Sequence, residues 1–201
     1  MSINHSNREV EIKLRVGSAA AAKALLRRAG FRVSEPRRFE ANAVFDTPER
    51  RLRAGSQLLR VRQCGRSVIL TYKGPPAPGK HKSREELEVT LDSAATLHTI
   101  LSRLGYEISF LYEKYRAEFR QQDGAGVVTV DETPIGDFLE LEGPPRWIDR
   151  TAALLGFSEA DYLTASYASL YVAWCETNKV SPLHMVFPAG KTSTKTRDNP
   201  I

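Results

Sequence analysis

The segment Glu9–Val16 alternates charged and apolar residues without a break. Charged side chains hold the odd positions and apolar side chains hold the even positions. Because successive side chains of a β-strand point to opposite faces, this period of two predicts a strand with one charged face and one apolar face. Taken alone, such a segment is typical of an edge strand with one face in water. Its interpretation therefore depends on whether other strands repeat the pattern.

Five further segments repeat this alternation. Each carries Arg, Lys or Glu in one phase and apolar residues in the other: residues 59–62, 70–73, 84–89, 114–120 and 139–142. Charged residues are generally depleted in strands, so a charged face in nearly every strand restricts the architecture. Either an open sheet turns its charged face to water, or the strands close into a barrel with charged faces in the lumen and helices outside. The alternation itself leaves both architectures open.

The rest of the chain predicts helices between these strands. Ser18 before an alanine-rich run and Gly30 after it predict a helix between them. Further helices are expected over residues 93–104, 147–155 and 165–175, with a short helical turn beginning at Thr47. Strands are expected over residues 9–16, 37–46, 57–63, 67–73, 83–91, 112–120, 126–131 and 138–142. We expect one domain over residues 1–176, followed by a mobile tail over residues 177–201 that lacks periodicity.

The composition narrows the class of protein. The chain has 201 residues, of which 41% are hydrophobic, and this is enough for one domain with a full core. Its net charge of +5 favours a polyanionic partner. No apolar run reaches the length of a membrane span, the first residues lack the apolar stretch of a signal peptide, and the two cysteines form no CxxC pair. We therefore expect a cytoplasmic protein without a membrane partner.

A series of motifs runs through the chain from about residue 8 to about residue 175. It comprises Glu9-x-Glu11-x-Lys13, Val44-Phe45-Asp46-Thr47-Pro48, Leu59-Arg60-Val61-Arg62, Leu70-Thr71-Tyr72-Lys73-Gly74, Ser83-Arg84-Glu85-Glu86-Leu87-Glu88, Glu113-Lys114-Tyr115-Arg116, the run from Val130 to Glu142, and Ser166-Tyr167. This series resembles the CYTH family, also called the triphosphate tunnel metalloenzymes. The motifs Glu113-Lys114-x-Arg116 and Gly136-Asp137-Phe138 look most like the class IV adenylate cyclase branch.

The resemblance implies a fold and a class of chemistry. The fold would be α+β, with an eight-stranded antiparallel barrel and helices packed outside it. The barrel would form a tunnel that binds a triphosphate and depends on Mg²⁺ or Mn²⁺. Members of the family include adenylate cyclases, thiamine triphosphatases and inorganic triphosphatases.

The basic residues in the charged phase are candidates for binding a triphosphate. Arg can hold phosphate oxygens with a planar fork, and Lys can hold them as a point charge. The candidates are Arg60, Arg62, Lys73, Arg84, Lys114 and Arg116. Lys82 and Arg120 share the phase and are further candidates.

The acidic residues in the same phase are candidates for binding a metal. Glu9, Glu11, Glu140 and Glu142 offer only oxygen ligands, which suit Mg²⁺ or Mn²⁺ and argue against zinc. Further candidates are Glu86 and Glu88, which either complete the metal site or hold the basic residues, and Asp131, which is either a ligand or a turn cap. Lys13 lies beside Glu11 in the charged phase, and we expect these two residues to take part in catalysis. Lys13 would either orient the nucleophile or contact phosphate.

These residues predict a metal-dependent enzyme that acts on a triphosphate. We favour hydrolysis of inorganic, nucleoside or thiamine triphosphate. The alternative is a class IV adenylate cyclase that makes cyclic AMP and pyrophosphate from ATP. A further alternative is a non-catalytic module that binds polyphosphate or RNA. Only 8% of the residues are aromatic, and they do not interleave with the basic residues, so nucleic acid is a disfavoured partner. We expect the chain to act as a monomer or a homodimer.

Overall fold

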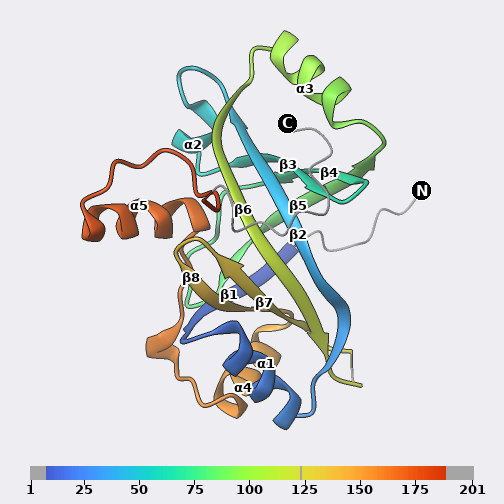
Figure 1. Ribbon diagram of the computed structural model, residues 1–201, viewed down its shortest axis with the longest axis vertical. Helices are drawn as coiled ribbons and strands as arrows, with labels where there is room; N and C mark the ends of the chain where they lie inside the picture. The colour runs from blue at the N-terminus through green and yellow to red at the C-terminus, as the bar shows by residue number, and fades with distance from the viewer. Residues whose placement is uncertain (1–7, 123, 189–201) are drawn as a thin grey trace.

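Eight antiparallel strands close into a barrel (Figure 1). The computed structural model describes residues 8–122 and 124–188. Around the barrel the strands follow the order β1-β5-β4-β3-β2-β6-β7-β8. Their bounds are β1 Arg8–Val16, β2 Arg32–Asp46, β3 Leu58–Cys64, β4 Ser67–Lys73, β5 Lys82–Leu91, β6 Glu107–Arg120, β7 Val127–Thr133 and β8 Gly136–Glu142. The predicted eight-stranded antiparallel barrel of an α+β fold is confirmed.

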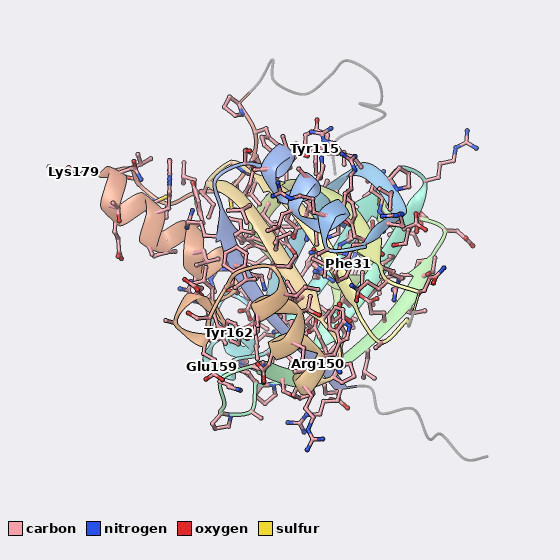
Figure 2. The ribbon with its side chains drawn as sticks, turned by 90° about the horizontal axis from the view of Figure 1, so that it is seen from below. Phe31, Tyr115, Arg150, Glu159, Tyr162 and Lys179 are labelled. Atoms are coloured by element: carbon pink, nitrogen blue, oxygen red, sulfur yellow. The ribbon has the colours of Figure 1, made fainter. Side chains whose placement is uncertain are left out.

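The helices pack outside the barrel or beside one of its openings. They are α1 Ala19–Arg28, α2 Arg51–Ala54, α3 Ala94–Arg103, α4 Pro145–Leu154, the 3₁₀ turn η1 Glu159–Asp161, and α5 Tyr167–Asn178. In Figure 1, α3 lies at one end of the molecule and α1 and α4 lie at the other. Seen from below in Figure 2, α5 projects to one side and ends beside Lys179. No helix in the described ranges is long and apolar enough to cross a membrane.

The apolar phase of the strands forms the core outside the barrel. Ile12 and Leu14 of β1 are fully buried against Leu26 of α1 and Ile148 of α4. A second core packs α3 over the outer faces of β2, β3 and β4. Because helices cover the apolar faces, the charged faces point into the lumen. The structure therefore decides between the two architectures that the alternation left open.

Two strands begin earlier than the alternation predicted. Strand β2 begins at Arg32, five residues before the expected start, and its pairing with β6 shifts register between Val33 and Glu35 and again between Glu35 and Arg38. Pro36 lies in this stretch and has no N–H to donate, so irregular pairing is the physical result. Strand β6 begins at Glu107, because it follows β2 along this whole length. The strand therefore continues through a stretch of irregular pairing that the sequence pattern did not reveal.

The C-terminal boundary also differs from the prediction. Helix α5 continues to Asn178, past the expected domain end at residue 176. Beyond it, Met185 is fully buried, its N–H donates to the carbonyl of Leu111 at 3.0 Å, and its own carbonyl accepts from Glu113 N–H at 2.9 Å. The ring of Phe187 lies 5.4 Å from that of Tyr115. Met185 and Phe187, in the segment expected as a tail, thus contact β6, and residues 189–201 lie outside the described part of the chain.

Candidate active site

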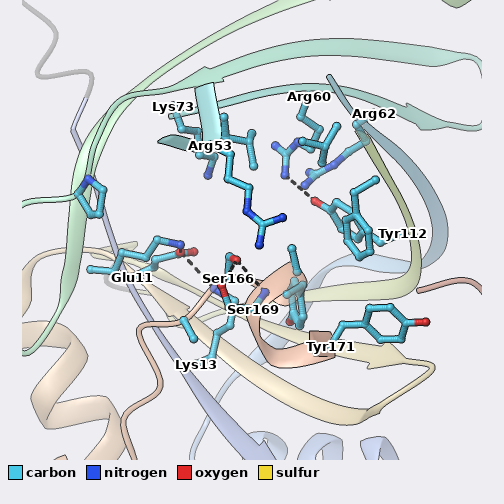
Figure 3. A pocket seen from close by; sticks show the side chains of 18 of the residues that line it. Glu11, Lys13, Arg53, Arg60, Arg62, Lys73, Tyr112, Ser166, Ser169 and Tyr171 are labelled. Atoms are coloured by element: carbon cyan, nitrogen blue, oxygen red, sulfur yellow. Dashed lines mark hydrogen bonds and ion pairs between the residues drawn. The ribbon is translucent and has the colours of Figure 1, made fainter. Parts of the chain in front are cut away.

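The inward faces of the strands line a chamber of about 1220 Å³ (Figure 3). Strand β1 contributes Glu9, Glu11 and Lys13 to its wall, which is the charged face of the first alternating segment. Residues of α5 between Tyr167 and Glu176 also line the chamber. Most of the sequence-predicted residues meet here: Glu9, Glu11, Lys13, Arg60, Arg62, Lys73, Lys82, Arg84, Glu86, Glu88, Lys114, Arg116, Glu140 and Glu142.

Three carboxylates form a compact group in the wall of the chamber. One oxygen from each of Glu9, Glu11 and Glu140 lies within 4.8 Å of the others. The register of β1 and β8 brings them together, since Glu11 pairs with Glu142 and Lys13 pairs with Glu140. The three side chains are between 3% and 9% exposed. An all-oxygen group of this size suits Mg²⁺ or Mn²⁺, which prefer oxygen ligands, better than zinc, which prefers nitrogen and sulfur.

The ionisation of this group is set by the lysines beside it. Burial acts to raise the pKa of Glu11, but Lys13 Nζ at 3.1 Å and Lys82 Nζ at 2.9 Å outweigh burial and hold that pKa below its usual value. Burial also acts to raise the pKa of Glu140, but Lys13 and Arg116 outweigh burial and lower that pKa. The group is therefore anionic and able to attract a cation.

Two further carboxylates at the same end of the chamber behave differently. Glu142 is within reach of water, but desolvation and the charges of Glu9, Glu140 and Glu86 raise its pKa to about 7. Desolvation is also the largest cause that raises the pKa of Glu86 to about 7, with Glu9 adding to it. Both carboxyls are therefore partly protonated near neutral pH, because desolvation and then the neighbouring carboxylates disfavour their charged forms.

Lys13 lies at the centre of the acidic wall. Its ammonium is 3.1 Å from Glu11 and 3.7 Å from Glu140. Burial acts to lower the pKa of Lys13, but the two carboxylates outweigh burial and hold that pKa above its usual value. The ammonium also lies 5.3 Å from the ring centre of Tyr167. A lysine in this environment stays protonated, so it can contact phosphate or fix carboxylates but cannot accept a proton.

Asp131 holds the basic wall in place. It is fully buried, and it accepts hydrogen bonds from Lys114 Nζ at 2.9 Å, from Arg116 Nε at 2.7 Å and Nη2 at 2.6 Å, and from the hydroxyl of Tyr167 at 2.7 Å. Burial acts to raise the pKa of Asp131, but Arg116 and Lys114 hold it well below the usual range. Its oxygens are thus saturated by donors. The structure places Asp131 behind the bases, where it is neither a ligand in the chamber wall nor the cap of a turn.

Besides Lys114 and Arg116 of β6, a second group of basic residues lies on β3. The guanidinium of Arg60 donates to the Tyr112 hydroxyl at 3.2 Å and to Thr71 Oγ1 at 3.0 Å, and it lies 3.4 Å from Glu88. Arg62 Nε donates to Asn42 Oδ1 at 3.0 Å. Arg60 and Arg62 are adjacent in the charged phase of one strand, so both reach the same side of the chamber.

The third basic group contacts the carboxylates directly. Lys73 Nζ lies 2.7 Å from Glu9 and 2.9 Å from Glu86, and Arg84 Nε lies 3.5 Å from Glu9. Glu86 thus contacts Lys73, and Glu88 contacts Arg60. Arg120 does not join the chamber, because it is exposed at the end of β6 opposite Arg32.

Several residues that line the chamber or contact its basic side chains were missed by the sequence analysis. Glu40 is 1% exposed and lies 3.4 Å from Arg62 and 3.7 Å from Lys114. Burial acts to raise its pKa, but Lys114 and Arg116 lower it to about 2. Arg38, Glu40 and Asn42 alternate with apolar residues just as the first strand does, so the signal was present. Tyr167 comes from α5 and Arg53 from α2, and no strand pattern could reveal them.

Comparison with known proteins gives the family. The sequence profile of the CYTH domain matches residues 7–154, which is most of the chain. The chain therefore belongs to the CYTH family. A protein of Methanocaldococcus jannaschii named as a candidate adenylate cyclase is 29% identical over 134 residues, which cover 67% of this chain and 75% of that protein.

Solved structures share the fold. A candidate adenylate cyclase from Vibrio parahaemolyticus superposes with a TM-score of 0.70 at 24% identity, covering 81% of this chain and 96% of the other. A Hippeastrum protein, described as a candidate adenylyl cyclase with a dominant triphosphatase activity, superposes with a TM-score of 0.61 at 20% identity, covering 83% and 95%. At these identities the likeness establishes the fold alone.

Proposed function

We propose that this chain is a metal-dependent enzyme that binds a triphosphate in the chamber and hydrolyses it. The observation that carries the proposal is the meeting of two groups in one chamber. An oxygen-only carboxylate group lies directly beside Lys and Arg side chains from β4, β5 and β6, and Arg60 and Arg62 of β3 line the same chamber. Carboxylates repel a phosphate chain unless a cation lies between them, so the pair of groups suits a metal–triphosphate complex better than a bare anion.

The residues that would hold the metal are Glu9, Glu11 and Glu140, with Glu142 at the mouth. A bound Mg²⁺ or Mn²⁺ would neutralise phosphate charge and polarise a phosphoryl oxygen. The chain's own part is to position the phosphate chain. Phosphoryl transfer depends mainly on such positioning and on charge stabilisation, so fixed bases are sufficient machinery.

The cationic side chains are held in place by hydrogen bonds before substrate binds. Arg116 and Lys114 are oriented by Asp131, and Arg60 is oriented by Thr71 and Tyr112. Side chains that are already held lose little conformational entropy when they bind, which favours binding of the transition state. The protonated ammonium of Lys13 would contact a phosphoryl oxygen next to the metal group.

A second candidate function is cyclisation of ATP. Its support is the size and mixed lining of the chamber, which exceeds the usual volume of small-molecule sites, about 300–1,000 Å³, and which includes Phe110, Tyr112 and Tyr171 beside the bases. Such a surface could hold an organic group attached to the phosphates. Cyclisation would require the ribose 3′-hydroxyl to attack the α-phosphorus and to expel pyrophosphate. The names of the Methanocaldococcus and Vibrio proteins agree with this candidate.

The test is a product assay on the purified chain. Tripolyphosphate, ATP and thiamine triphosphate are incubated with Mg²⁺ or Mn²⁺, and phosphate, pyrophosphate and cyclic AMP are quantified. We expect phosphate release that chelation with EDTA abolishes. Cyclic AMP with an equal amount of pyrophosphate from ATP would favour the cyclase instead. No turnover of any substrate with either metal would contradict both enzyme candidates.

A variant pair makes this assay specific to the chamber. Glu11→Gln removes a carboxylate from the proposed metal group, whereas Glu85→Gln removes an exposed carboxylate from β5 outside the chamber lining. We expect Glu11→Gln to lower kcat at least about 100-fold, which corresponds to a rise of about 3 kcal/mol in the activation free energy. We expect Glu85→Gln to keep wild-type activity. Thermal unfolding of both variants separates lost chemistry from lost fold.

A further inference from the structure

Arg53 differs from every other cation in the chamber wall. Eleven Lys and Arg side chains line the chamber in the described part of the chain. Ten of them lie within 4.0 Å of a carboxylate: Lys13, Arg38, Arg50, Arg60, Arg62, Lys73, Lys82, Arg84, Lys114 and Arg116. Arg53 is the exception among the described residues. Its guanidinium offers five N–H donors and a full charge that no described carboxylate neutralises.

The backbone of Arg53 is nevertheless held firmly. Asp46 is 3% exposed at the end of β2, where its Oδ2 accepts from Arg53 N–H at 3.0 Å. The other oxygen, Oδ1, accepts from Leu52 N–H at 2.9 Å and from Thr47 N–H at 2.8 Å. One buried carboxylate thus anchors the whole α2 turn. The Asp46 carboxylate is occupied by backbone N–H donors, which leaves the Arg53 side chain free.

The side chain of Arg53 points into the chamber. Figure 3 shows its guanidinium in the open space between Arg60 and Ser166. Ser166 lies at the start of α5, so Arg53 extends from one side of the opening towards the other. The neighbouring Arg51 is different, because its side chain is 76% exposed, pairs with Glu49 at 3.6 Å and is not part of the lining.

We propose that Arg53 is the capture residue for the triphosphate: it binds a phosphate group without breaking an ion pair in the chamber. This proposal rests on the proposed function, since it names a binding residue for the same substrate. At each of the ten paired cations an entering phosphate must compete with a carboxylate that already holds the base. At Arg53 there is no such competitor, so its contribution is largest when no divalent metal is present to engage the carboxylates.

The test is binding of tripolyphosphate in EDTA by isothermal titration calorimetry. A hydrogen-bonded charge contact contributes about 1.5–3 kcal/mol, so we expect Arg53→Gln to raise Kd by about 10- to 100-fold. Arg51→Gln is the matched control on the same turn, and we expect it to bind within about twofold of wild type, as fits an exposed ion pair of small worth. Arg53→Lys should recover part of the lost affinity, because it restores the charge without the fork.

Turnover with Mg²⁺ gives a second readout. Arg53→Gln should raise KM and leave kcat nearly unchanged, because capture precedes the chemical step. Equal Kd values for wild type and Arg53→Gln in EDTA would overturn the capture role while leaving the proposed function intact. If the wild-type chain bound no tripolyphosphate and turned over no triphosphate in metal, the proposed function and the capture role would fall together. Unchanged thermal unfolding of Arg53→Gln confirms that the comparison is made between folded proteins.

Discussion

Glu40, which contacts Arg62 and Lys114 of the chamber wall, shows how strongly single residues depend on their neighbours. It is almost completely buried, yet the cations around it lower its pKa to about 2. An unfolded glutamate has a pKa of about 4.3. A carboxyl with a depressed pKa in the folded state adds stability that is present above the unfolded pKa and is lost as the pH falls through the folded pKa.

We therefore expect the stability advantage of wild type over Glu40→Gln to be pH-dependent. The difference in unfolding free energy should be largest above a pH of about 5 and should shrink as the pH falls towards 2, because both forms then carry a neutral side chain. Urea unfolding at a series of pH values measures it. Glu35→Gln, on an exposed carboxylate of the same strand, is the control and should have a smaller effect at every pH. A constant difference for Glu40→Gln across the range would contradict this account.

Tyr112 reports the charge of the basic wall. Burial acts to raise the pKa of Tyr112, but Arg60, Arg62 and Lys114 outweigh burial and lower it to about 8. The near-ultraviolet absorbance of phenolate should therefore show a titration step near this pH that Tyr112→Phe removes, which isolates it among the seven tyrosines. Tripolyphosphate should move the step to higher pH, because its negative charge offsets the bases. If tripolyphosphate left the pH of this titration step unchanged, the anion would not bind near β3.

At the scale of elements, the strands were readable from sequence and the helical contributions were not. Alternation in β1, β3, β6 and β8 predicted which side chains share a face, and the chamber wall contains most of them, with Arg120 as an exception. What alternation could not give was the closure of the barrel, because register depends on which strands pair. Pro36 interrupts the alternation, so the first residues of β2 could not be predicted as a strand. The motif Thr47-Pro48 gave no sign that the Arg53 side chain, in the turn that follows, points into the chamber.

Helix α5 supports Lys114 and Arg116 through the hydroxyl of Tyr167. Tyr167 donates to Asp131 at 2.7 Å, and Asp131 orients Lys114 and Arg116. Removing that hydroxyl with Tyr167→Phe should cost about 1–2 kcal/mol of stability, the cost of an unmade buried hydrogen bond. It should also raise KM for the triphosphate, because the two bases lose part of their support.

Unfolding in urea and steady-state kinetics measure these two effects of Tyr167→Phe. Tyr106→Phe is the control, since Tyr106 packs in the outer core beneath α3. A loss of stability without any change in KM would show that α5 supports the fold alone and does not tune the bases.

At the scale of the whole molecule, the barrel concentrates acids and bases in one enclosed space and turns apolar residues outward to the helices. This is why the lumen carries carboxyls that titrate near neutrality. Glu86 and Glu142 each have a pKa of about 7. A divalent cation that binds beside them should displace their protons.

Metal binding should accordingly be coupled to pH. Below a pH of about 7 these carboxyls are protonated, so Mn²⁺ binding should release protons and its affinity should fall as the pH falls. Calorimetry in buffers of different ionisation enthalpy counts the protons. Glu142→Gln should reduce the number released, whereas Glu85→Gln should not. Binding without proton release at pH 6.5 would place the metal away from this end of the chamber.

Metal and triphosphate are proposed to occupy one chamber together. The most direct measurement is anomalous diffraction from crystals of the wild-type chain grown with Mn²⁺ and tripolyphosphate. The account predicts a manganese peak within bonding distance of Glu9, Glu11 and Glu140, with phosphate density between it and the bases of β3 and β6. A protein that turns over triphosphate while its manganese lies outside the chamber would contradict the account.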